Sequence, residues 1–186
     1  MPNSAPVIVL NGGDTVAATL VENSTGWTAA GIFHFTDVDT TDTHTLTKQL
    51  VPGQSSGPTA RGLLTVTLGA DSTGGGQGRV DWSYNWLSAN RDFLAKNQVY
   101  TETYELKVND LHGGITSRNV VLTLIGTNDV PVVTLEPGNS AAASRTLQID
   151  TPAVESAAGT VSFSDPDYAD THSLSFVYDA DGSTLA

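Results

Sequence analysis

The strongest constraint on this chain is an internal repeat. Residues 29–47, AAGIFHFTDVDTTDTHTLT, align without gaps on residues 157–175, AAGTVSFSDPDYADTHSLS, at a shift of 128 positions. Nearer the start, residues 3–10 (NSAPVIVL) match residues 128–135 (NDVPVVTL) at a shift of 125 positions. Two unrelated loops would not agree at so many positions, so the sequence indicates tandem copies of one module.

The repeat also sets the expected module boundaries. Residues 1–127 would form one complete module, and residues 128–186 would form the N-terminal half of a second copy of it. Half of a β-sandwich on its own exposes apolar faces and open strand edges. Either this half-module self-associates by borrowing strands from another chain, or the module boundary is misplaced, and the sequence leaves both alternatives open.

Alternation of apolar and polar residues predicts β-strands throughout the chain. In the clearest case Val80, Trp82, Tyr84 and Trp86 alternate with polar residues, which places the four side chains on one face and in the core. The other expected strands are residues 6–10, 16–21, 31–36, 44–51, 62–68, 99–109 and 115–125, followed in the second copy by 132–135, 145–149, 159–164 and 173–179. With only one short helix expected, at residues 88–96, the pattern predicts an all-β, antiparallel β-sandwich.

The charge balance limits the partners of such a sandwich. Asp and Glu number 20 against 8 Lys and Arg, which gives a net charge of −12. This charge repels nucleic acid and anionic membrane surfaces and favours divalent cations. The chain contains no cysteine, so a metal ion is the available brace in place of disulfides. No apolar run reaches the roughly 18 residues of a membrane span, and we expect no membrane insertion.

Candidate metal ligands lie in an acidic loop that occurs once in each copy. The first loop carries Asp37, Asp39 and Asp42, and the second carries Asp165, Asp167 and Asp170. Alternate carboxylates at the end of an extended segment, with a third one three residues on, can converge on one point. They supply the oxygen ligands that Ca2+ (calcium) prefers. The alternative is a solvated acidic turn, because Asp favours turns in any case.

The geometry of a sandwich suggests where further ligands come from. If the first strand enters at the acidic-loop end, the linker residues Asn128 and Asp129 come close to the second acidic loop. Glu22, at the far end of the first strand pair, is expected at the same junction. Asp110, in a hairpin turn, is expected beside the first acidic loop. Because Ser4 stands where the second copy has Asp129, we expect the outer site to be the weaker one.

Several of these motifs resemble a VCBS, or bacterial cadherin-like, repeat. The resemblance lies in GTNDVPVV at residues 126–133, the D-x-D loops, and a hairpin turn that keeps Asp110, Gly113 and Gly114 but has Leu111 where the family usually has glycine. Such repeats occur in large RTX adhesins that type I systems secrete to the bacterial surface and into biofilms. The resemblance implies an extracellular immunoglobulin- or cadherin-like module. It would act as a calcium-stiffened spacer between neighbouring repeats of the same chain.

Other features admit other interpretations. Trp82, Tyr84 and Trp86 can form a sugar-stacking platform, which would make the chain a carbohydrate- or protein-binding module. A spacing of two is nevertheless ordinary for a core strand. His44 and His172 follow Asp-Thr in both copies, where each can bind zinc or orient a carboxylate. The glycine-rich residues 74–81 are interpreted as a loop, because a β-roll needs several stacked copies. No catalytic set of side chains stands out, so an enzyme is not expected.

Overall fold

The computed structural model describes residues 2–23, 26–134 and 159–175 of the chain. The strands are β1 (Val7–Val9), β2 (Ala17–Val21), β3 (Thr28–Thr36), β4 (Thr45–Leu50), β5 (Gly62–Ala70), β6 (Gly78–Trp86), β7 (Val99–Asn109), β8 (Ile115–Ile125), β9 (Val132–Thr134) and β10 (Ser162–Ser164). Two 3-10 turns, η1 (Pro52–Gln54) and η2 (Ser88–Asn90), interrupt the connections. Among the described residues, no helix has the length and apolarity needed to cross a membrane.

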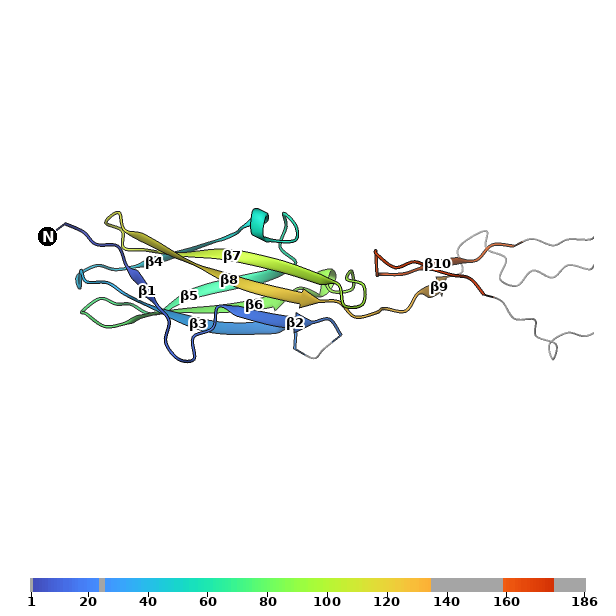
Figure 1. Ribbon diagram of the computed structural model, residues 1–186, viewed down its shortest axis with the longest axis horizontal. Coiled ribbons are helices and arrows are strands. Elements are labelled where there is room, and N and C mark those ends of the chain that lie inside the picture. Colours follow the sequence, from blue (N-terminus) through green and yellow to red (C-terminus); the bar gives the residue numbers. More distant parts are fainter. Residues whose placement is uncertain (1, 24–25, 135–158, 176–186) are drawn as a thin grey trace, which may run out of the picture.

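The first eight strands form a β-sandwich of two four-stranded sheets, as Figure 1 shows. One sheet has the order β1-β3-β6-β5 and the other the order β2-β8-β7-β4. These orders match an immunoglobulin-type arrangement, in which the strands divide between two facing sheets that pack over one core. The predicted all-β sandwich is therefore confirmed, with one exception to the antiparallel pattern. β2 pairs with β8 in parallel, with Ala17 opposite Val121 and Val21 opposite Ile125.

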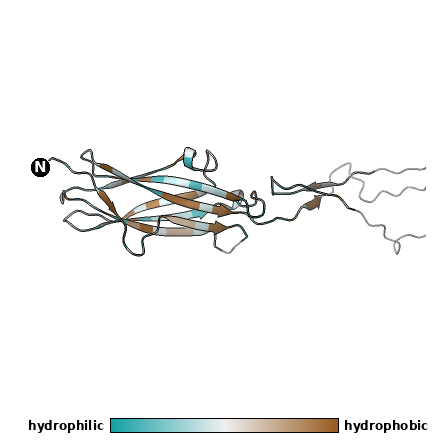
Figure 2. Ribbon diagram, in the orientation of Figure 1, coloured by the Kyte–Doolittle hydropathy of each residue, from teal (hydrophilic) through white to brown (hydrophobic). Residues whose placement is uncertain are grey.

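The core is built from the inward-facing residues of both sheets, and Figure 2 shows hydrophobic residues concentrated along the strands. Trp82, Tyr84 and Trp86 are all buried, which confirms the prediction for this strand. The Trp82 indole NH donates a 2.7 Å hydrogen bond to the carbonyl of Thr15, so the polar edge of the ring is satisfied. Gly31 makes room for this ring, because a Cβ there would lie 2.6 Å from Trp82 Cζ2.

The parallel β2–β8 pair follows from a change of sheet between β1 and β2. β1 pairs with β3 in one sheet, and after the turn at residues 11–14 the chain continues as β2 in the other sheet. Since β2 and β8 run the same way, both strands end at the same end of the sandwich. This is the end that leads to the linker and β9, opposite the N-terminus (Figure 1).

The matching segments of the repeat have the same backbone pairing. Val133 pairs with Phe163 in β9–β10, just as Ile8 pairs with Phe35 in β1–β3. Their surroundings differ, because Phe163 is 51% exposed whereas Phe35 is fully buried. The local structure of the motif is therefore the same in both copies. That residues 128–186 belong to a second module stays a prediction.

Some expected elements differ from the structure. Residues 88–96 form only the single 3-10 turn Ser88–Asn90, and Ser88 does not cap it, since Leu87 occupies the N-cap position. In the second copy only Ser162–Ser164 of the expected strand 159–164 is paired, and residues 173–175 are not in a strand. The expected strand at 145–149 and the rest of 173–179 lie outside the described residues.

Candidate metal centre

One acidic cluster lies at the outer end of the sandwich, next to the N-terminus. It consists of Asp37 and Asp42 from the β3–β4 loop and Asp110 from the β7–β8 turn, all buried. A carboxylate oxygen of each lies within 4.8 Å of the other two. Asp110 is thus beside the first acidic loop, where the hairpin argument placed it. Asp39 is not a member of this group of three.

Most of the carboxylate oxygens at the outer end accept hydrogen bonds from other groups of the protein. Asn3 Nδ2 donates to Asp110 Oδ2 at 2.9 Å, and the backbone NH groups of His112 and Gly114 donate to Asp110 Oδ1 at 2.8 and 2.9 Å. Burial alone would raise the pKa of Asp110. The hydrogen bonds from Asn3, His112 and Gly114 outweigh it and leave the pKa below its ordinary value. The backbone NH of Ser4 donates to Asp39 Oδ2 at 2.7 Å.

His44 lies behind the outer cluster and orients it. Its Nε2 is 3.2 Å from Asp37 Oδ2 and its Nδ1 is 2.6 Å from Asp71 Oδ1. Both ring nitrogens are therefore engaged by carboxylates, and His44 belongs to no group of three metal-ligating side chains among the described residues. The arrangement matches the interpretation that His44 orients a carboxylate. Asp71 had no sequence signal, because it lies 27 positions from its partner.

A second acidic cluster lies at the junction between the sandwich and the linker. Glu22, Asp92 and Asp129 each bring a carboxylate oxygen within 4.8 Å of the other two. Glu22 directly follows β2, and the parallel pairing carries it to the end of β8, where Glu22 Oε2 accepts a 2.7 Å hydrogen bond from the backbone NH of Thr127. Asp92 comes from the β6–β7 connection and Asp129 from the linker.

The second acidic loop joins this junction cluster through Asp167. The backbone NH of Asp129 donates to Asp167 Oδ2 at 2.8 Å, as the NH of Ser4 does to Asp39 in the first copy. His172 Nε2 lies 2.7 Å from Asp165 Oδ2, and this hydrogen bond lowers the pKa of Asp165. The repeat therefore reproduces the hydrogen bonds of the acidic loop as well as its sequence.

Buried oxygen atoms without hydrogen bonds distinguish the junction cluster. Glu22 and Asp167 are each only 1% exposed, yet Glu22 Oε1 and Asp167 Oδ1 have no hydrogen-bond partner, and neither does Asp129 Oδ2. Burial, together with the charges of Asp129 and the other nearby carboxylates, raises the pKa of Glu22 and of Asp167. Buried carboxylate oxygens without donors are energetically costly, and a bound cation removes that cost.

The residues present therefore fit a hard divalent cation. Carboxylate oxygens from three segments of the chain converge, and the cysteine-free ligand set is of the all-oxygen kind that suits Ca2+. In such a site Glu22, Asp92, Asp129 and Asp167 would hold the ion, which supplies positive charge where the chain gathers negative charge.

The structure separates the sequence-predicted residues into groups. Asp37, Asp42 and Asp110 meet at the outer end, and Glu22, Asp129 and Asp167 meet at the junction. The backbone NH of Asp170 donates to Asp167 O at 3.0 Å, and Asn128 is exposed, with its amide donating to Asp129 O at 2.6 Å. Sequence reasoning missed Asp92, because the segment that carries it was expected to be helical and gave no acidic motif.

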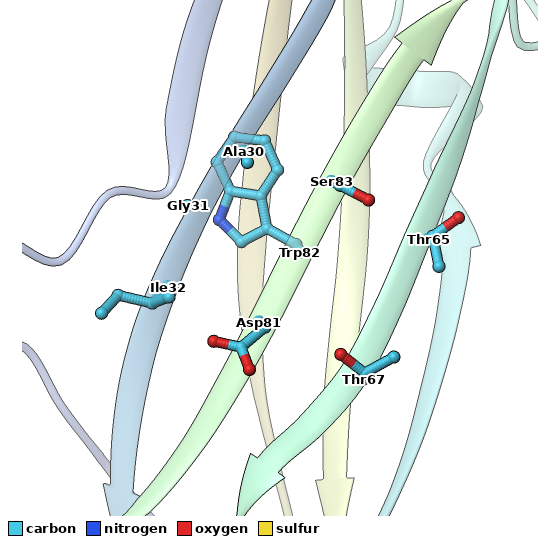
Figure 3. Close-up of a pocket in the computed structure, with 8 residues that line it drawn as sticks. All are labelled: Ala30, Gly31, Ile32, Thr65, Thr67, Asp81, Trp82 and Ser83. Atoms are coloured by element: carbon cyan, nitrogen blue, oxygen red, sulfur yellow. The ribbon is translucent and has the colours of Figure 1, made fainter.

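The proposed glycan platform is not available in this arrangement. Figure 3 shows the residues that line a hollow on the β3–β6–β5 sheet, which are Ala30, Gly31, Ile32, Thr65, Thr67, Asp81, Trp82 and Ser83. The aromatic rings of Trp82, Tyr84 and Trp86 are buried in the sandwich, so a sugar cannot stack on them from outside.

Comparisons with known proteins give a likeness of fold only. No known family profile matches the sequence, and no curated protein matches it either. One similar solved structure is a crystal structure of a variant of the SrpA adhesin from Streptococcus sanguinis, with a TM-score of 0.45 and 13% identity over 68% of this chain and 60% of that one. Another is a PapD-like domain of human CEP192, with a TM-score of 0.36 and 13% identity over 68% of this chain and 87% of that one.

Proposed function

We propose that this chain is a calcium-binding spacer segment of a large bacterial surface adhesin, in which an ion at the junction stiffens the joint between consecutive modules. The observation that carries the proposal is Glu22. Its side chain is buried, its Oε1 has no donor, and it lies in one cluster with Asp92 and Asp129. A purely structural glutamate in this position would have its second oxygen satisfied.

The stiffening follows from where the four carboxylates are attached. Glu22 directly follows β2 and Asp92 lies in the β6–β7 connection, so both are attached to the sandwich. Asp129 and Asp167 belong to the linker and to the loop after β10. Without a cation these groups repel one another, which favours opening of the joint. A cation held by both sides would link them and restrict bending.

The proposed setting is the outside of a bacterial cell, reached by type I secretion as for RTX adhesins. Extracellular calcium modules typically bind with dissociation constants of about 10⁻⁴–10⁻³ M. Sites of that affinity stay empty in the cytosol and fill outside, where calcium is millimolar. The joint would then be slack during export and stiff at the cell surface.

A calcium titration of the whole chain tests this function. Saturating a site at a hundredfold excess over its dissociation constant adds about 2.7 kcal/mol to the free energy of unfolding. We expect EDTA to lower the melting temperature and to broaden the distance distribution in small-angle X-ray scattering, and millimolar calcium to reverse both effects. Magnesium should be a poor substitute, because it releases its water ligands reluctantly. Identical melting curves in EDTA and in calcium would rule the proposal out.

A further inference from the structure

We propose that Arg91, stacked on Trp27, is a positioning residue that holds Asp92 in the junction cluster. The inference rests on the proposed calcium site and adds to it the residues that preorganise its third carboxylate. Asp92 needs such support, because it is exposed and lies in a connection with only a single 3-10 turn. An unsupported carboxylate there would be driven away by the charges of Glu22 and Asp129.

The contacts of Arg91 fix the chain on one side of Asp92. Its guanidinium carbon lies 3.7 Å from the centroid of the Trp27 ring, within the range of a cation–π interaction. Nε and Nη2 both donate to the carbonyl oxygen of Trp86, at 3.1 and 3.0 Å. Trp86 is fully buried at the end of β6, and its backbone NH donates to the carbonyl of Trp27 at 2.9 Å. Arg91 is thereby fastened to the rigid sandwich at two points.

The residues on the other side of Asp92 are anchored as well. The Phe93 ring packs edge-on against Tyr100, with centroids 5.6 Å apart, and the guanidinium of Arg61 lies 4.3 Å from the centroid of Phe93. Leu94 is fully buried in the core. Asp92 is therefore the one exposed residue between side chains that are held in place, and its direction is set by its neighbours.

Because Arg91 is positively charged, the direction in which its removal changes cation affinity tests the inference. Arg91 directly precedes Asp92 in the chain, yet it forms no ion pair with Glu22, Asp92 or Asp129. Its Nε and Nη2 donate to the carbonyl oxygen of Trp86 instead. Removing a positive charge near a cation site should by itself tighten cation binding. If Arg91 positions Asp92, its removal should instead weaken binding.

The experiment measures calcium affinity by calorimetry in the full chain carrying Arg91→Gln, Trp27→Leu, or both. We expect each single substitution to weaken binding at the junction roughly tenfold, because ligand charge and site rigidity set the affinity of such sites. The double variant should be no weaker than Arg91→Gln alone, since Trp27 acts on Asp92 only through its contact with Arg91. Arg91→Lys keeps the charge but not the planar stacking or the paired donation, and should behave like Arg91→Gln.

A second measurement needs no metal. Hydrogen exchange in EDTA should be faster at the amides around Asp92 in Arg91→Gln than in the parent chain, while the amides of β7 and β8 keep their protection. Unchanged or tighter calcium binding by Arg91→Gln, or losses that add in the double variant, would overturn the inference. Asp129→Ala separates this failure from that of the proposed function. If Asp129→Ala weakens binding and Arg91→Gln does not, only the positioning role is wrong, whereas if neither weakens it the junction site itself is wrong.

Discussion

At the outer end of the sandwich, protein donors satisfy most of the carboxylate oxygens in and around the first acidic loop. At the junction, the corresponding loop of the second copy lies beside buried carboxylate oxygens that have no donor. Asp110 accepts hydrogen bonds from Asn3, His112 and Gly114, and its pKa is lowered. Glu22 and Asp167 each have an oxygen without a partner, and their pKa values are raised. The two ends show that the carboxylates around the same D-x-D motif are satisfied by protein donors in one setting and left with unpaired oxygens in the other. The site depends on which other segments the fold brings to it.

The outer end nevertheless keeps one feature of the junction. Asp42 Oδ2 has no hydrogen-bond partner, although it lies 3.3 Å from His112 Nδ1. That nitrogen lies 3.0 Å from the carbonyl of Asp110, and the His112 side chain is 60% exposed. The outer end thus has one unsatisfied carboxylate oxygen where the junction has three. That the outer site is the weaker one, because Ser4 stands in place of Asp129, stays a prediction.

The largest expected effect provides a baseline that is common to both ends. Trp82→Ala removes a buried indole from the middle of the sandwich, and it should lower the free energy of unfolding by about 3–5 kcal/mol. Urea denaturation should give the same loss in EDTA and in saturating calcium, because Trp82 lies in neither cluster. A loss confined to one of the two conditions would mean that the core and the acidic ends are coupled.

Matched substitutions compare the ends directly. Asp39 and Asp167 occupy the same position in the two copies, and each accepts a backbone hydrogen bond from a residue of the preceding linker. We expect Asp167→Asn to weaken the tightest calcium binding by roughly tenfold or more, because it removes one of few carboxylate ligands. Asp39→Asn should leave this affinity unchanged in the same titration. Equal effects of the two substitutions would break the distinction between the ends.

The pH dependence of the metal-free chain should have opposite signs at the two ends. Since the pKa of Glu22 is raised on folding, its contribution favours folding below the ordinary carboxyl pKa and is lost as the pH rises through the raised value. Since the pKa of Asp110 is lowered, its contribution is present above the ordinary carboxyl pKa and is lost as the pH falls through the lowered value.

Two isosteric substitutions check these signs by urea denaturation in EDTA. Glu22→Gln should make the metal-free chain more stable at neutral pH, because it removes a buried charge among other carboxylates. Asp110→Asn should make it less stable at neutral pH, because hydrogen bonds to a carboxylate are stronger than those to an amide. Destabilisation by Glu22→Gln in EDTA would contradict an unsatisfied Glu22 carboxylate.

The smallest expected effect comes from making the outer end more like the junction. Ser4→Asp places a carboxylate where the second copy has Asp129, next to the acidic loop to which the Ser4 backbone NH already donates. We expect a few-fold gain in calcium affinity at the outer end, measured by calorimetry in the Asp167→Asn background. Ser4→Asn is the uncharged control, and it should produce no gain.

The sequence alone determined the strands of the sandwich, the core face of β6 and the acidic loops. Period-two alternation identifies Val80, Trp82, Tyr84 and Trp86 as one buried face, because successive side chains in a strand point to opposite sides. The repeat alone shows that Asp37 and Asp165 occupy equivalent positions. Their hydrogen bonds are alike as well, because local hydrogen bonds follow from local sequence. The turn at Asn97 has a φ of 64°, in the left-handed region that asparagine tolerates.

The sequence argument placed Glu22 at the junction and Asp110 beside the first acidic loop, but only the tertiary structure decided how these carboxylates meet and that Asp92 joins them. The parallel pairing of β2 with β8 brings Glu22 to the start of the linker. There Glu22 accepts a hydrogen bond from the backbone NH of Thr127, which lies 105 positions away in the sequence. Asp92 reaches the same point because Arg91, Phe93 and Leu94 anchor its connection to the sandwich. Such long-range encounters depend on the order of strands in the sheets and on the side chains that fix a loop. Neither leaves a periodic or local signal in the sequence.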